Sequence, residues 1–174
     1  MEMHEANLQD PPRPGERREL LETNLARLLG WIAAADAKLS PILAINSAAL
    51  GALAAFAGPI QNWTPTMIVL VATTLLLLTI SLLNIFLANF PRTSGPKGSL
   101  VYFGGITDAG PDQFVSRILT VSLDEYAHDL AQQCYRNAQI AGEKFQHVRL
   151  AMVYLFVALV PWAVAIYLLY RARA

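Results

Sequence analysis

Two long stretches without a charged residue constrain this chain more than any other feature of its sequence. Between Lys38 and Arg92 there is no Asp, Glu, Lys or Arg, and a second gap runs from Arg149 to Arg171. A bilayer core of about 30 Å is crossed by roughly 20 apolar helical residues, because a helix satisfies its own backbone hydrogen bonds. Both gaps are long enough for membrane-spanning helices.

The first gap is too long for one span, and it has a break in its middle. The break, Gly58-Pro59-Ile60-Gln61-Asn62-Trp63-Thr64-Pro65, contains two prolines, a glycine and an interfacial Trp. We therefore predict spans at Leu39–Ala57 and Met67–Phe90, and a third at Leu150–Tyr170. The expected fold is an all-α membrane protein with three transmembrane helices and a small helical cytoplasmic module. Three charge-free runs of this length disfavour the alternative, buried core helices in a soluble protein.

The basic residues predict an orientation in the membrane. Apart from Arg171 and Arg173, they lie before Leu39 and between the second and third spans, whereas the 58–66 hairpin has none. By the positive-inside rule the N-terminus and the 91–149 segment are cytoplasmic and the hairpin is outside. This arrangement places the C-terminus outside, which conflicts with Arg171 and Arg173.

Outside the spans the sequence predicts two helical segments. Residues 1–15 are rich in Pro and are expected to be disordered, and residues 16–38 form a cytoplasmic helix that leads into the first span. Residues 91–149 form a cytoplasmic loop and a long helix. A capping box, Ser122 to Glu125, marks the start of that helix. The apolar patch Leu100–Phe103 is either a short strand or a loop on the membrane surface.

The long helix carries polar residues beside its apolar face. At about 100° per residue, Asp129, Gln133, Asn137 and Lys144 form one strip that borders the face containing Cys134. Spacing alone favours the wet edge of an amphipathic helix. The alternative is a buried or half-buried polar network.

The charges nearest the membrane need partners. Asp36 and Lys38 are two residues apart and point to different faces of their helix, so they do not pair with each other. The polar strip offers Lys144 for Asp36 and Asp129 for Lys38. We expect a juxtamembrane polar cluster that links the cytoplasmic helices to the spans.

Small and polar residues inside the spans predict helix contacts. Ser47, Gly51 and Ala55 repeat every four residues, a spacing that lets helix backbones approach within one chain or in a homo-oligomer. Asn46 and Asn84 lie at similar predicted depths and are expected to meet, within or between subunits. An ordinary interhelical hydrogen bond is one interpretation; a polar lining that admits water or ions is the other.

Composition excludes several classes of function. Charged residues make up 15% of the chain and the formal net charge is zero, which argues against a nucleic-acid partner. The single cysteine cannot supply a thiolate-rich zinc site. No phosphate loop, metal-ligand spacing or catalytic constellation is visible, so we expect neither a metal, a cofactor nor an enzyme.

Three motifs resemble those of a known family. Ala35-Asp36-Ala37-Lys38 looks like the "aDaK" motif at the first span of the bacterial Pycsar transmembrane effectors (PycTM), and Tyr102–Ile106 resembles their "fFGdI" element. The segment from Asp129 to Lys144 resembles their last helix before the membrane. Two positions depart from the pattern: Gly105 replaces the usual acidic residue, and Cys134 stands where an aliphatic residue is common.

The resemblance implies a membrane effector of antiphage defence in the bacterial inner membrane. In such systems a pyrimidine cyclase makes cyclic UMP or cyclic CMP, and the effector impairs the membrane and causes abortive infection. The alternatives are a non-toxic accessory or structural subunit and an effector of another nucleotide-signalled system. If the nucleotide binds this chain, its site needs a cation, base-reading groups and stacking rings. The candidates are Lys38, Arg136 or Lys144 as the cation, Asp129, Gln133 and Asn137 for the base or ribose, and Tyr102, Phe103 and Tyr135 for stacking.

Overall fold

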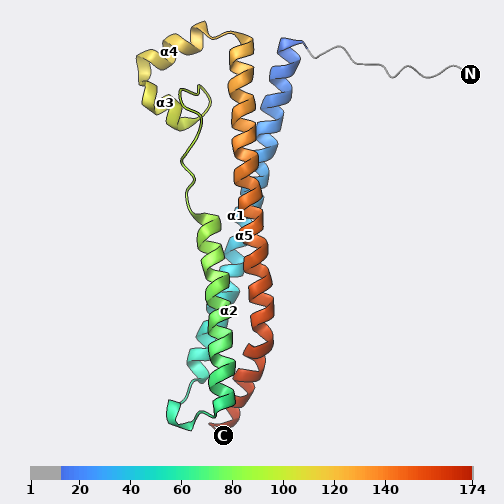
Figure 1. The fold of residues 1–174 in the computed structure, drawn as a ribbon, viewed down its shortest axis with the longest axis vertical. Helices are drawn as coiled ribbons and strands as arrows, with labels where there is room; N and C mark the ends of the chain where they lie inside the picture. The colour runs from blue at the N-terminus through green and yellow to red at the C-terminus, as the bar shows by residue number, and fades with distance from the viewer. Residues whose placement is uncertain (1–12, 174) are drawn as a thin grey trace, which may run out of the picture. The chain divides into compact units, whose positions relative to one another are not determined.

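Helices account for all the regular secondary structure between residues 13 and 173, which the computed structural model describes. In chain order the elements are α1 (Pro14–Phe56), a short 3-10 turn η1 (Ile60–Asn62), α2 (Pro65–Asn89), α3 (Phe103–Ala109), α4 (Pro111–Thr120) and α5 (Leu123–Arg171) (Figure 1). This part of the chain contains no strand. The strand alternative for Leu100–Phe103 is therefore wrong, since residues 100–102 are irregular and Phe103 begins α3.

Three helices are long and apolar enough to cross a membrane, as the charge gaps predict. They are α1, α2 and α5. At 1.5 Å per residue, the 25 residues of α2 extend about 38 Å, enough for a hydrocarbon core. The limits of the spans within α1 and α5 stay a prediction, because both helices are much longer than a bilayer core requires.

The ends of the helices follow from local chemistry. Thr64 caps α2 by accepting a hydrogen bond from the Met67 N–H at 3.3 Å, and Pro65 occupies the first turn, where its missing N–H costs nothing. The predicted capping box at α5 is confirmed. The Ser122 Oγ accepts from the Glu125 N–H at 3.2 Å, and Glu125 Oε2 accepts from the Ser122 N–H at 3.1 Å.

The start of α1 differs from the prediction. The helix begins at Pro14, so Pro14 and Gly15 are helical rather than disordered. Residues 1–12 of the predicted disordered segment lie outside the described residues. Pro41 lies within α1 and does not end it.

The chain divides into two compact units, and α1 and α5 contribute residues to both. We call Trp31–Pro91 with Ile140–Ala174 the span unit, and Met1–Gly30 with Arg92–Gln139 the loop unit. The span unit contains all of α2, and the loop unit contains α3 and α4. Each unit has its own buried side chains.

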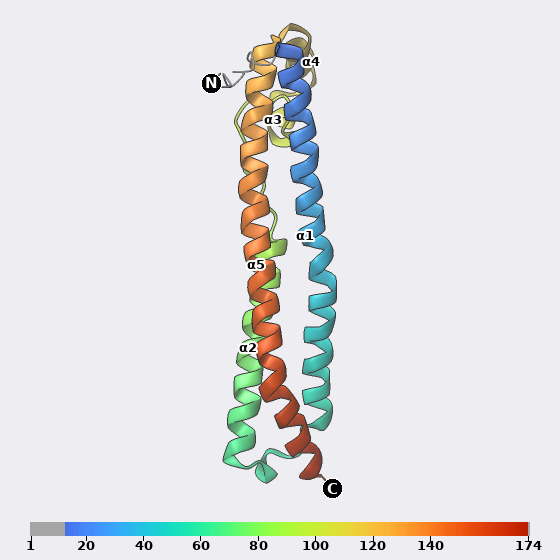
Figure 2. The same ribbon diagram turned by 90° about the vertical axis from the view of Figure 1, so that its right-hand side faces the viewer.

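In the span unit α1 and α5 run parallel to each other and α2 runs antiparallel to both (Figure 2). The cross-helix contacts show this order: Ala49 meets Trp162 and Ala57 meets Arg173, whereas Asn84 meets His147 and Ser81 meets Ala151. The buried apolar core is supplied by all three helices: Ala35, Leu39, Ile42, Ala49, Leu53, Val71, Leu78, Ile85, Ala88, Val148, Ala151, Leu155, Ala158, Ala165 and Leu169.

The two terminal arginines have partners within the span unit. The Arg173 guanidinium donates to the carbonyl oxygen of Ala57, just after α1 ends, at 2.8 Å. Arg171 lies over the Tyr167 ring, 5.9 Å from its centroid. A carbonyl at a helix C-terminus is a favourable partner for a cation.

The loop unit has a smaller core, built on the first turns of α5. Leu130 is fully buried, and Leu28, Leu100 and Ala127 of this unit are also buried. Cys134 lies on the predicted apolar face, and its Sγ donates to the Leu21 carbonyl oxygen at 3.4 Å. Burial raises the pKa of the Cys134 thiol. The thiol therefore stays protonated and serves as a packing group.

Candidate functional site

The segment between α2 and α3 is held on α5 by side chains of the predicted polar strip. The Asp129 carboxylate accepts from the Leu100 N–H at 2.6 Å, and the Gln133 amide donates to Ser99 Oγ at 3.2 Å. Gln133 is 4% exposed. For these two positions the buried network is correct and the wet-edge interpretation is wrong, because the segment covers this side of α5.

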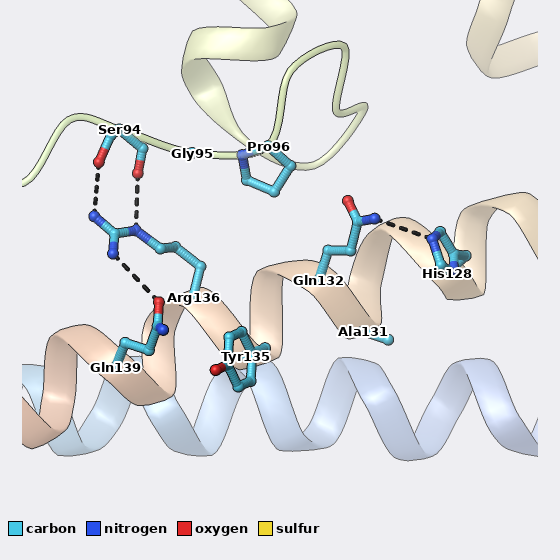
Figure 3. Close-up of a pocket in the computed structure, with 9 residues that line it drawn as sticks. All are labelled: Ser94, Gly95, Pro96, His128, Ala131, Gln132, Tyr135, Arg136 and Gln139. Carbon is cyan, nitrogen blue, oxygen red and sulfur yellow. Dashed lines mark hydrogen bonds between the residues drawn. The ribbon is translucent and has the colours of Figure 1, made fainter.

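The same segment is bound at a second point by an arginine. The Arg136 guanidinium donates to the Ser94 carbonyl oxygen at 2.9 Å and to Ser94 Oγ at 2.7 Å (Figure 3). It also donates to Gln139 Oε1 at 3.4 Å. Asn137 donates to the Gln133 carbonyl oxygen of its own helix at 2.9 Å. The connection that follows α2 is thus attached to α5 at Ser94, Ser99 and Leu100.

A cavity of about 530 Å³ lies between this connection and α5, within the loop unit. On the α5 side the Arg136 and Gln132 side chains extend toward Ser94 to Pro96 (Figure 3), and Tyr135 and His128 also line the cavity. The Tyr135 side chain is 69% exposed, and the Gln132 amide contacts the His128 ring at 3.0 Å. Its full lining is Ser94, Gly95, Pro96, His128, Ala131, Gln132, Tyr135, Arg136 and Gln139. Ligand pockets have volumes of about 300–1,000 Å³, so this cavity has the size of a small-molecule site.

A second cavity of about 310 Å³ adjoins the first, since His128 and Gln132 line both. Its lining carries more polar and charged groups: Lys97, Gly98, Ser99, Leu100, Arg117, Thr120, Val121, Glu125, His128, Asp129 and Gln132. Hydrogen bonds from the backbone N–H and the hydroxyl of Ser122, with the nearby Arg117 charge, hold the pKa of the exposed Glu125 carboxyl below its usual value.

The predicted ligand residues of the loop unit fall into two groups. Tyr135 and Arg136 line the first cavity and Asp129 lines the second. Gln133 and Asn137 instead make the structural hydrogen bonds described above. The Tyr102 hydroxyl donates to the Thr93 carbonyl oxygen, and the Phe103 ring packs on that of Tyr102 at 4.6 Å between centroids. None of these last four side chains lines either cavity.

Some lining residues were not predicted as ligand residues. His128, Gln132 and Gln139 recur at spacings of four and seven on the solvated face of α5, beside Tyr135 and Arg136. That spacing places them together on one helix face, and it was the signal available in the sequence. Lys97 and Arg117 carried no such signal, because only the fold brings their segments to α5.

The predicted ion pair at the membrane border is formed within the span unit. Lys144 Nζ contacts Asp36 Oδ1, with the Lys144 side chain 12% exposed and that of Asp36 41% exposed. Lys38 does not pair with Asp129 as expected. Its ammonium lies over the Phe145 ring, 5.4 Å from the centroid, whereas Asp129 is bound to the Leu100 N–H. The pair therefore ties α1 to α5.

The amides of the spans also differ from the prediction. Asn46, fully buried, donates to Ser81 Oγ at 3.0 Å, and Ser81 donates to the Ala151 carbonyl oxygen at 2.8 Å. The Asn84 side-chain oxygen contacts His147 Nδ1 at 3.1 Å. The expected contact between Asn46 and Asn84 is thus not formed within one chain, because the Asn46 amide bonds to Ser81 of α2 and the Asn84 oxygen contacts His147 of α5. Asn46 Oδ1 is buried without a hydrogen bond to any described residue.

The small-residue stripe of α1 is not used for packing within the chain. Ser47, Gly51 and Ala55 are all exposed. A Cβ placed on Gly51 would meet no atom within 4 Å. The face of α1 that packs in the core carries other residues, among them Ile42, Ala49 and Leu53.

The fold and these contacts define a class of protein. The protein is a helical membrane protein with three helices able to span a bilayer and a smaller unit that contains two adjoining cavities. Between residues 13 and 173, no cluster of three or more His, Cys, Asp or Glu side chains is placed to hold a metal ion.

Comparison with known families identifies the particular group. The family model PycTM, described as a Pycsar effector protein domain, matches residues 20–171. The chain therefore belongs to the PycTM effector family of Pycsar antiphage systems, which is not a known catalytic family. Membership implies a cyclic-nucleotide signalling context and association with a membrane. Neither the curated proteins nor the solved structures gave a significant match.

Proposed function

We propose that this protein is a membrane effector activated by cyclic UMP or cyclic CMP, which impairs the inner membrane and causes abortive infection. The observation that supports this most directly is the family match over residues 20–171, which includes both units of the fold. A pyrimidine cyclase is the expected functional partner, because it would make the activating nucleotide. The effector itself needs no catalytic group.

The first cavity is the proposed nucleotide site. A pyrimidine ring can stack on the exposed face of Tyr135, and the amides of Gln132 and Gln139 can read its polar edge. Arg136 lies at the same wall and is already bound to Ser94. A ligand that accepts hydrogen bonds from Arg136 would compete with Ser94 for the guanidinium.

This competition offers a route from the ligand to the spans. Ser94 belongs to the connection that begins where α2 ends, at Asn89, and α5 itself continues from the cavity-lining residues into the span unit. Binding that shifts Ser94 or Arg136 therefore acts directly on two of the three spanning helices. If the resting and active states begin at about 99:1, reversing that ratio needs roughly 5.5 kcal/mol of differential affinity.

The orientation follows from the basic residues. We propose that the N-terminus and the loop unit are cytoplasmic, where a cyclase product is available, and that the 58–66 hairpin is outside. The buried amides of Asn46 and Asn84 are the polar groups that a rearrangement of the spans would expose to water. The unpaired Oδ1 of Asn46 supports this role, because an unsatisfied buried acceptor costs free energy in the resting state.

We also propose that the protein is a homo-oligomer in the membrane. The exposed stripe of Ser47, Gly51 and Ala55 allows a second copy to approach the α1 backbone closely. Gly51→Leu is expected to lower the oligomeric fraction in detergent severalfold, as measured by cross-linking, without unfolding the monomer. Ala163→Leu, at an exposed position of α5, is the control. An oligomeric fraction unchanged by Gly51→Leu would count against this interface.

The proposed activity is tested by membrane potential in cells that express the protein. We expect a potential-sensitive dye to report depolarisation when cyclic UMP or cyclic CMP is supplied, and no change without nucleotide. Tyr135→Ala removes the stacking surface and is expected to raise the half-maximal nucleotide concentration about tenfold, since stacking on a base is worth roughly 1–3 kcal/mol.

The control for this test is a variant of an exposed aromatic that lines neither cavity. Phe103→Ala should leave the nucleotide response unchanged. A correctly inserted protein that responds to neither nucleotide would reject the proposal. In that case a response to another cyclic nucleotide would indicate a different signalling system, and no response to any would favour an accessory membrane subunit.

A further inference from the structure

The second cavity differs in chemistry from the first, although the two share His128 and Gln132. The first offers an aromatic ring and amides; the second brings Lys97 and Arg117 together beside His128. A cyclic nucleotide has the same two-part character, with an aromatic base at one end and a singly charged phosphate ring at the other. The two cavities together therefore present the groups that such a ligand requires.

The two cations of the second cavity are available for a ligand. Within residues 13–173, neither the Lys97 ammonium nor the Arg117 guanidinium donates a hydrogen bond or forms an ion pair at contact distance. Arg136, by contrast, already donates to Ser94 and Gln139. An anion entering here would gain the charge-assisted hydrogen bonds of Arg117 and Lys97 without breaking existing ones.

The loop backbone approaches Arg117 at Gly98. Gly98 has φ +68, a conformation that favours glycine, and a Cβ built on it would lie 3.6 Å from Arg117 Nη1. The loop backbone thus lies directly against the guanidinium, and the residue before it is Lys97. Lys97 and Arg117 therefore line the same cavity from two different segments, the loop and α4.

The carboxylates of the second cavity have defined partners. Asp129 accepts from the Leu100 N–H, and Glu125 accepts from the Ser122 N–H and hydroxyl. His128 contacts Gln132. A carboxylate oxygen of Asp129 remains as an acceptor for a ribose 2′-hydroxyl, which a cyclic nucleotide presents next to its phosphate.

We propose that the second cavity is the phosphate-binding half of a bipartite nucleotide site, in which Lys97 and Arg117 hold the cyclic phosphate while the pyrimidine lies against Tyr135 in the first. This assignment rests on the proposed function and adds two residues to it. It also replaces Lys38, Arg136 and Lys144 as the phosphate cation. The bound nucleotide would bridge α4, the loop at Gly98 and α5.

The assignment is tested by measuring the affinity of the full-length protein in detergent micelles for cyclic UMP and cyclic CMP. Isothermal titration calorimetry gives this affinity. Lys97→Ala and Arg117→Ala are each expected to weaken the wild-type affinity about 10- to 100-fold, as hydrogen bonds to charged groups are worth roughly 1.5–3 kcal/mol. Arg117→Lys should lose less. Arg27→Ala, which removes an exposed cation that lines neither cavity, should change nothing.

Salt dependence separates a phosphate contact from a structural role. The wild-type affinity should fall as the KCl concentration rises, and this dependence should be weaker in the double variant Lys97→Ala/Arg117→Ala. Suppose that the wild-type protein binds. An affinity unchanged in both single variants would then overturn this assignment alone, and so would an equal loss of affinity in Arg27→Ala. Failure of the wild-type protein to bind either nucleotide would overturn the proposed function, and the assignment with it.

Discussion

Replacing Asp36 with Asn is expected to lower the free energy of unfolding by about 3 kcal/mol, because it leaves the Lys144 ammonium unpaired. The Lys144 side chain is 12% exposed, so water cannot replace the lost carboxylate fully. Removing one partner of a buried pair costs about 3–5 kcal/mol, whereas an exposed pair is worth about 0–1 kcal/mol. The expected loss lies at the lower end of the buried range.

Replacing the lysine of this pair, instead of the aspartate, should lower the free energy of unfolding by less. Lys144→Met keeps an apolar stem of similar length and leaves unpaired only Asp36, whose side chain is 41% exposed and can be hydrated. We expect a loss of about 1 kcal/mol. Thermal and denaturant unfolding of the protein in detergent micelles would measure both values. The asymmetry between the two single variants is the specific prediction.

A charge swap completes the test. The double variant Asp36→Lys/Lys144→Asp should recover part of the loss, with a coupling energy within the 0.5–3 kcal/mol typical of contacting residues. Lys38→Met is the control, since the Lys38 ammonium is on an exposed residue and lies over a ring rather than beside a carboxylate. Additive single and double variants would show that Asp36 and Lys144 are not coupled.

This pair also shows how far sequence reasoning reaches. The absence of charge between Lys38 and Arg92 and between Arg149 and Arg171 was sufficient to predict three helices able to span a membrane, because hydrocarbon excludes charge. The pairing of Asp36 with Lys144 was predicted because a charge at the membrane border needs a partner. In both cases a single physical requirement, that hydrocarbon holds no unpaired charge, leaves few possible structures.

The remaining contacts depend on how the segments pack. Asn46 and Asn84 have similar predicted depths, yet the packing turns Asn46 toward Ser81 and Asn84 toward His147. Depth along a helix does not specify rotation about its axis, so the predicted contact is not formed within one chain, and a contact between subunits stays a prediction. Spacing favours a wet edge for the polar strip of α5, because nothing in it shows that the segment after α2 covers Asp129 and Gln133.

The candidate site was predicted only in part for the same reason. Tyr135 and Arg136 lie on α5, where helical spacing gives their neighbours, and both line the first cavity. Lys97 and Arg117 come from the loop and from α4, and only the fold brings them together. The short helix α3 was also missed, since its first residues, Phe103-Gly104-Gly105, have low helix propensity.

Gly105→Ala is expected to destabilise the loop unit by about 2–3 kcal/mol, in the range for overpacking of a filled site. Gly105 lies within α3 and is buried. A Cβ there would lie 2.5 Å from the Ser99 carbonyl oxygen and 2.7 Å from the Ser99 nitrogen. These are backbone atoms, and the Ser99 side chain is itself bound to Gln133, so the turn cannot move without breaking contacts to α5.

A matched control separates this clash from the general effect of replacing a helical glycine. Gly30→Ala, in α1, meets no atom within 4 Å and should stabilise the protein by up to about 1 kcal/mol through helix propensity. Gly105→Asp should be at least as destabilising as Gly105→Ala, because it adds a carboxylate to the same clash. Thermal unfolding would compare the three variants. A Gly105→Ala protein as stable as the wild type would show that the Ser99 turn is free to move, and would remove the steric reason for glycine at this position.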